Sequence, residues 1–149
     1  MKKYSFTEET KVIFGVTLHR IKAEISFGIV KKGEIGGWIE KEENLDQSGN
    51  AWVSGNAWVF GDAKVYGNAW VFGDAEVSGN AWVFGDAKVF GDAKVYGDAK
   101  VYGNAKVYGN AKVSGNAWVF GDAEVYGNAW VSGNAWVSGN AWVFGDAKV

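Results

Sequence analysis

The sequence predicts an all-β protein, a left-handed parallel β-helix that forms a triangular solenoid of about six coils behind an N-terminal β cap. Two observations predict it. From Gly49 to Val149 the chain repeats Gly-(Asn/Asp)-Ala-x-Val-y without an insertion. Before about residue 40 the repeat is missing, and apolar residues alternate with polar ones instead. We therefore expect an N-terminal β-strand or hairpin cap over 1–40 and a hexapeptide-repeat β-helix over 41–149.

Each six-residue unit specifies a short strand and a corner. Glycine tolerates any φ, and Asn or Asp is the side chain most readily accepted in the left-handed region, so Gly-(Asn/Asp) forms the corner. In the strand Ala-x-Val-y, side chains alternate, so Ala and Val share the inner side. Three corners close a coil of about 18 residues, stacked at roughly 4.8 Å. The first coil's interior should hold Ala51, Ala57, Ala63, Val53, Val59 and Val65, with the aromatic residues outside.

The N-terminal segment predicts two or three short strands. Apolar residues alternate from Val12 to Leu18 and again from Ile21 to Phe27, with bends at Gly15 and at Lys31-Lys32-Gly33. Apolar positions of the downstream repeat continue backward into a degenerate first coil at Ile35, Ile39 and Leu45. A solenoid exposes strand edges at its ends, so this segment is interpreted as a cap.

The repeats resemble the bacterial hexapeptide-repeat left-handed β-helices over about two thirds of the chain. The segment from Gly33 to Leu45, which leads into Gly-Asn-Ala-Trp-Val repeats, is also similar to a narrower group of phage and Firmicutes proteins. The first resemblance implies the fold. The second implies an origin in a phage or mobile element, but no mechanism.

The residues needed for catalysis or metal binding are scarce. The chain has one His and no Cys, and corner geometry already explains aspartates such as Asp62. His19 lies in an alternating segment, where a surface strand residue is expected rather than a general base. Acyltransferases of the resembled class use a His near a subunit interface and a loop excursion, and neither is seen. We expect no catalytic residue, metal or cofactor; an acyltransferase relative dependent on His19 is the disfavoured alternative.

The two outward positions of each unit are where recognition would be encoded. Folding the sequence at three units per coil gives aromatic columns, which predict a protein-binding face or a ladder that only stabilises the coils. The candidate face comprises eight residues: Trp52, Trp70, Phe72, Phe90, Tyr108, Tyr126, Trp142 and Phe144.

A basic belt is the second candidate surface. It occupies five consecutive units, at Lys88, Lys94, Lys100, Lys106 and Lys112. Aspartates two residues before three of these lysines offset much of the local charge, and the whole chain has a net charge of −2. We therefore favour a solvated face over a nucleic-acid site, and expect no membrane association.

The sequence thus predicts a rigid, non-enzymatic protein-binding scaffold, whose partner is a host protein or another copy. The phage-like resemblance implies an inhibitor of a bacterial defence protein that acts in the cytoplasm, the host cytosol if phage-encoded. A self-assembling structural or virion module is the alternative. Because Val149 ends the chain in repeat register, a homodimer through an open C-terminal coil is also expected.

Overall fold

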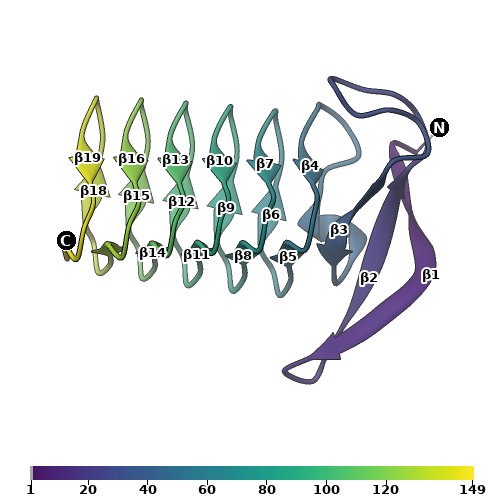
Figure 1. Cartoon of the computed structure of the whole chain (residues 1–149), viewed down its shortest axis with the longest axis horizontal. Coiled ribbons are helices and arrows are strands. Elements are labelled where there is room, and N and C mark those ends of the chain that lie inside the picture. The colour runs from purple at the N-terminus through teal and green to yellow at the C-terminus, as the bar shows by residue number, and fades with distance from the viewer. Residues whose placement is uncertain (1) are drawn as a thin grey trace.

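A computed structural model, which describes residues 2–149, shows an all-β chain wound into a solenoid of about six coils (Figure 1). The β-solenoid with an N-terminal hairpin, predicted from the sequence, is confirmed. Among the described residues the only helical element is the 3₁₀ turn η1 (Glu42–Asn44), and no helix is long and apolar enough to cross a membrane.

The strands divide into a long N-terminal set and a series of two-residue strands. The first set is β1 (Tyr4–Ile13), β2 (Val16–Ala23) and β3 (Ile35–Ile39). The series is β4 (Trp52–Val53), β5 (Trp58–Val59), β6 (Lys64–Val65), β7 (Trp70–Val71), β8 (Glu76–Val77), β9 (Trp82–Val83), β10 (Lys88–Val89), β11 (Lys94–Val95), β12 (Lys100–Val101), β13 (Lys106–Val107), β14 (Lys112–Val113), β15 (Trp118–Val119), β16 (Glu124–Val125), β17 (Trp130–Val131), β18 (Trp136–Val137) and β19 (Trp142–Val143).

Three sheets form the sides of the solenoid. They contain eight strands (β1-β2-β3-β5-β8-β11-β14-β17), six strands (β19-β16-β13-β10-β7-β4) and five strands (β18-β15-β12-β9-β6). In the repeats, partners pair in parallel three units apart, as in Val53 with Val71. Backbone amides bond to the following coil, for example Trp58 N to Ala75 O at 3.0 Å. Every coil therefore depends on its neighbours for the hydrogen bonds of its strands, whereas the alanine amide after most corners bonds within the coil, as from Ala57 N to Ser54 O at 3.2 Å.

The interior is a single column of alanine and valine. The six residues expected to line the first coil are all at most 1% exposed, and the pattern continues through Val131. Burying one valine stabilises the fold by roughly 1.5–3 kcal/mol relative to its exposed state. The predicted inward and outward sides are confirmed in the repeats.

The corners require glycine for two reasons, conformation and space. At Gly97 φ is +68°, and an added Cβ would lie 2.9 Å from the backbone N of Gly115 in the next coil. The adjacent Asx residues also stack: Asn80 Nδ2 donates to Asp98 Oδ1 at 3.1 Å. The backbone, the corner glycines and the Asn or Asp side chains therefore all repeat at the same spacing between coils.

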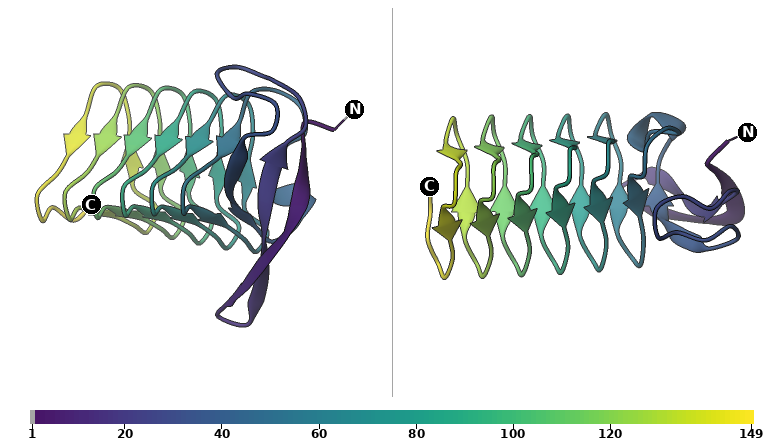
Figure 2. Two further views of the ribbon diagram at one scale, coloured as in Figure 1. Left: turned by 45° about the vertical axis from the view of Figure 1, so that its right-hand side comes forward. Right: turned by 90° about the horizontal axis from the view of Figure 1, so that it is seen from above.

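The N-terminal hairpin continues the eight-stranded sheet. β1 and β2 pair antiparallel around a turn in which Phe14 and Gly15 have φ of 51° and 76°. β3 pairs antiparallel with β2 and parallel with β5, so it links the predicted cap to the solenoid in one sheet. Figures 1 and 2 show the free end of the hairpin projecting beyond the side of the solenoid.

The degenerate first coil is longer than the coils of the repeat. Ile39 pairs with Val59 and Leu45 with Val65, so each pairing spans two residues more than the pairings within the repeats. Both are fully buried, but Ile35 is 48% exposed. The expectation that Ile35 takes an apolar position of the repeat was therefore wrong, because the pairing of Trp38 with Trp58 aligns Ile35 with the corner residue Gly55 instead of with an inward valine.

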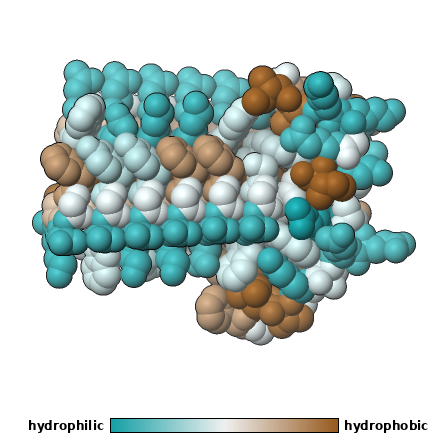
Figure 3. Space-filling view, in the orientation of Figure 1, coloured by the Kyte–Doolittle hydropathy of each residue, from teal (hydrophilic) through white to brown (hydrophobic). Residues whose placement is uncertain are grey.

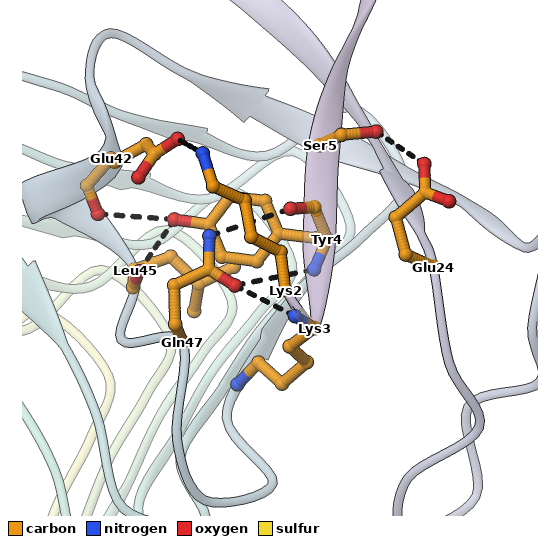
Figure 4. A network of polar contacts seen from close by, with 8 residues as sticks. All are labelled: Lys2, Lys3, Tyr4, Ser5, Glu24, Glu42, Leu45 and Gln47. Carbon is orange, nitrogen blue, oxygen red and sulfur yellow. Dashed lines mark hydrogen bonds and ion pairs between the residues drawn. The ribbon is translucent and has the colours of Figure 1, made fainter.

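The cap supplies hydrogen-bond donors to carbonyl groups at the start of the solenoid. Lys3 Nζ donates to the carbonyl of Ala51 at 2.9 Å, and Asn44 Nδ2 donates to those of Gly61 and Ala63 at 3.1 and 2.9 Å. Around Lys3, Gln47 Oε1 accepts from the Lys3 backbone N–H, and the Tyr4 hydroxyl donates to Leu45 O (Figure 4). These bonds satisfy backbone groups that a solenoid end would leave unpaired.

The loss of stability on replacing a corner glycine should depend on how closely the next coil approaches the added side chain. We expect Gly97→Ala to lower the free energy of unfolding by about 2–4 kcal/mol, because positive φ costs about 1–2 kcal/mol and the methyl group also presses on Gly115. Gly139→Ala is the matched control: its φ is +65° and nothing lies within 4 Å of the added Cβ. Denaturant unfolding measures both, and equal losses would contradict the crowding argument.

The buried Lys3 should make stability depend on pH. Burial lowers the pKa of Lys3 from 10.5 to about 8, against the raising effect of Asp46. Between these values the unfolded state binds more protons than the folded state, so stability should rise with pH. We expect the wild type to gain about 1–2 kcal/mol over Lys3→Met from pH 7.5 to 9.5. A constant difference between the two proteins across this range would refute the assignment.

Candidate protein-interaction surface

The outer side of the six-stranded sheet, here the six-stranded face, carries one continuous aromatic column. Five of its rings form what we call the long ladder: Phe72, Phe90, Tyr108, Tyr126 and Phe144. Successive rings stack with centroids 4.8, 4.8, 5.0 and 5.3 Å apart and planes within 10°. Figure 3 shows a brown and pale row along the solenoid between hydrophilic rows.

Neighbouring side chains fix the rings of the long ladder. Trp70 meets Phe72 edge to face at 6.4 Å, and Trp142 meets Tyr126 in the same way at 6.4 Å. The Tyr108 hydroxyl donates to Glu124 Oε1 at 3.0 Å. Burial, this hydrogen bond and the charge of Glu124 raise the pKa of Tyr108 to about 12. The rings of this surface are therefore held in place by edge-to-face contacts and by a hydrogen bond.

Exposure is uneven along the candidate face. The first four rings of the long ladder and Trp70 are partly buried, whereas Phe144 is 55% and Trp142 62% exposed. Stacking explains this, because each ring is partly covered by its neighbours. The ladder thus stabilises the coils and still leaves an apolar strip at the surface.

Trp52 does not belong to this surface. It is only 4% exposed, because Tyr4 and Phe27 pack against its ring at centroid distances of 6.5 and 5.3 Å. Its outward position in the repeat is therefore covered by the N-terminal segment. The expectation that Trp52 contributes to an exposed face was wrong.

The five-stranded face carries a second, shorter ladder of Tyr66, Phe84, Tyr102 and Phe120. Beside it Lys100 Nζ lies 5.3 and 5.4 Å from the ring centroids of Trp82 and Trp118. These cation–π contacts hold the lysine between two rings. The short ladder is thus a natural comparison for the long one.

The predicted basic belt does encircle the solenoid, but the structure spreads it over three faces. Lys88 and Lys106 pair on the six-stranded face, Lys94 and Lys112 on the eight-stranded face, and Lys100 lies on the five-stranded face. Lys112 Nζ also lies 4.8 Å from the ring centroid of Trp130. The five lysines therefore do not converge on one ligand.

Two exposed features were missed in the sequence. The free end of the hairpin exposes Val12 (67%) and Phe14 (83%), and the alternation that predicted these strands gave no sign that their tip projects beyond the solenoid. A hollow of about 630 Å³ also runs along the eight-stranded face, over β5 to β17. Its column of Trp58, Glu76, Lys94, Lys112 and Trp130 was readable at the same three-unit spacing.

His19 lies on β2 and stacks on Phe6, with centroids 4.5 Å apart and planes 2° apart. No group of three or more His, Cys, Asp or Glu side chains among residues 2–149 is placed to hold a metal ion.

Comparison with protein families gives one match. Residues 123–139 match the model described as the YdcK β-solenoid repeat. The match covers one coil and agrees with the observed fold. No curated protein sequence matches the chain.

Proposed function

We propose that this protein is a rigid, non-enzymatic scaffold that binds another protein through the long ladder. The main evidence for this proposal is the apolar strip of stacked rings on the six-stranded face, bordered by Lys88, Lys106 and Glu124. Apolar surface with a charged border is typical of protein interfaces, whose centres are enriched in aromatic residues.

Preorganisation supports this proposal. The rings are held by stacking, by the edge-to-face contacts of Trp70 and Trp142, and by the bond from Tyr108 to Glu124. Side chains that are fixed before binding lose little conformational entropy when a partner docks. A flat, rigid strip also favours a folded partner with a complementary surface.

The partner's identity is a narrower part of the proposal. The resemblance of the repeats to phage proteins suggests a bacterial defence protein, which the scaffold would inhibit by covering its surface. The alternative of self-assembly predicts that the long ladder docks on further copies of the chain, giving a mass that rises with concentration.

The test is a capture from bacterial lysate with three baits. One is the wild type; the second replaces the long ladder with Phe72→Ser, Phe90→Ser, Tyr108→Ser, Tyr126→Ser and Phe144→Ser. The matched control changes the short ladder with Tyr66→Ser, Phe84→Ser, Tyr102→Ser and Phe120→Ser. We expect one protein on the wild type and the control, and at least tenfold weaker binding of the purified partner to the long-ladder variant, because apolar contact area is lost.

Circular dichroism must show that all three baits are folded at the capture temperature. Equal retention by the long-ladder variant would refute the proposed surface, and capture of nothing by the wild type would refute a bacterial protein partner. A wild-type mass that grows with concentration and falls in the long-ladder variant would favour self-assembly.

A further inference from the structure

The free end of the β1–β2 hairpin is an apolar tip that extends past the solenoid. Residues 12–18 read Val-Ile-Phe-Gly-Val-Thr-Leu and contain no charged side chain. Val12 is 67% and Phe14 83% exposed, and no other large hydrophobic residue that the structure describes is as exposed as Phe14. Figure 1 shows the tip below the side of the solenoid that carries β5, β8, β11 and β14. A projecting apolar element of this kind indicates a contact with something outside the chain.

The charged residues that flank the tip are held against the solenoid. On β1 the nearest is Lys11, whose Nζ lies 4.2 and 4.8 Å from the ring centroids of Trp38 and Trp58. On β2 the nearest is Arg20, whose guanidinium lies 5.2 Å from the Trp38 centroid and whose Nε donates to Gly36 O at 2.9 Å. Neither cation reaches toward the free end of the hairpin, so the tip presents an uncharged surface.

We propose that this tip inserts into the interface of a lipid bilayer with zwitterionic headgroups and so anchors the solenoid to it. Val12 and Phe14 enter the boundary between headgroups and acyl chains, about 5–10 Å deep, together with the half-buried Ile13 and Val16. The hydroxyl of the exposed Thr17 lies behind them, at the level of the headgroups. Acyl chains reject charge and adapt to any apolar shape, which suits a convex tip without charged side chains.

The eight-stranded face, past which the tip projects, matches zwitterionic headgroups in charge. Its hollow is lined by equal numbers of the two signs, namely Lys11, Lys94 and Lys112 with Asp74, Glu76 and Asp92. The lysines suit the lipid phosphates and the carboxylates suit the choline groups. Trp130, 44% exposed on the same face, is of the residue type enriched at membrane interfaces. Because these charges balance, we expect no preference for anionic lipid.

A pocket on a second protein is the other kind of contact that such a tip could make. Protein pockets select a ligand by shape and by a few placed polar groups, and the apex at Phe14 and Gly15 offers no side-chain donor or acceptor. We therefore favour the bilayer. Composition and charge alone predict no membrane association, since the apolar run of the tip is short; only its projection in the fold indicates one.

A tip of four apolar side chains makes a weak and reversible anchor. A single myristoyl chain binds bilayers with a constant of ~10⁴ M⁻¹, and we expect ~10³ M⁻¹ for the smaller tip, or half of the protein bound at about 1 mM lipid. The long ladder lies on a different face and stays free when the tip is inserted. The anchor does not depend on the proposed function of the long ladder.

Co-sedimentation with phosphatidylcholine vesicles tests the anchor. The combined change Val12→Thr and Phe14→Asn should weaken binding at least tenfold; Thr keeps the strand propensity, and Asn tolerates the φ of 51° at residue 14. Ile29→Asn is the matched control and should bind within about twofold of the wild type. Ile29 is 72% exposed, in the loop between β2 and β3, which lies on the opposite side of the molecule in Figure 1. Adding phosphatidylserine to the vesicles should not tighten binding, because the net charge is −2.

A fluorescent label locates the inserted segment. The chain has no cysteine, so Val12→Cys can be labelled at this one site with a nitrobenzoxadiazole group. On addition of phosphatidylcholine vesicles its emission should rise and move to shorter wavelength, because the label leaves water. The same label at Ile29→Cys should keep its aqueous spectrum. Circular dichroism and melting temperature establish that each variant is folded.

Four results would each overturn the proposal. One is a wild type that stays unbound at about 5 mM phosphatidylcholine, well above the expected midpoint. Another is equal binding by the tip variant, or an aqueous spectrum for the label at residue 12 in the presence of vesicles. Binding that requires phosphatidylserine would assign the contact to lysines instead of the tip. Finally, a protein that the wild type retains and the tip variant does not, without any binding to vesicles, would assign the tip to a protein pocket.

Discussion

The hydrogen bonding of each coil to the next is the constraint on which the rest of this structure depends. Because partners lie three units apart throughout the repeats, every corner must turn within the same length of chain and at the same place. Glycine at positive φ makes that turn, and its hydrogen leaves space for the backbone of the adjacent coil, as at Gly97 and Gly115. Alanine and valine then fill an interior too narrow for larger side chains.

The same constraint decides what the surface can be. Any outward residue lies directly above its equivalent in the next coil, so residues three units apart form columns. Where such a column is aromatic, its rings form a stacked ladder. A column has a direction along the solenoid, and its order of charges can be matched or mismatched by another column. Recognition by this fold is therefore expected to depend on sequences of side chains along a face rather than on a pocket with converging groups.

The sequence was sufficient for the features that follow from the repeat alone. Ala51 and Val53 were expected inside, and the ring column from Phe72 to Phe144 outside, because strand alternation and the three-unit coil fix both. The sequence was insufficient where the N-terminal segment, which lies outside the repeat, contacts the repeat. Trp52 is covered by Tyr4 and Phe27, and Ile35 is exposed because the first pairing spans a longer stretch of chain than those in the repeats. Neither the covering of Trp52 nor the longer first pairing has a periodic signal in the sequence.

Amide hydrogen exchange, resolved by residue, tests the dependence of each coil on its neighbours most directly. If nearest-neighbour stacking sustains the fold, the amides of Lys88, Lys94 and Lys100, which donate to the following coils, should be the slowest to exchange. Protection should decline toward the coil that contains Trp142 and be weakest at the hairpin turn. Central amides that exchange as fast as those of the hairpin turn, or terminal amides as protected as the central ones, would contradict this account.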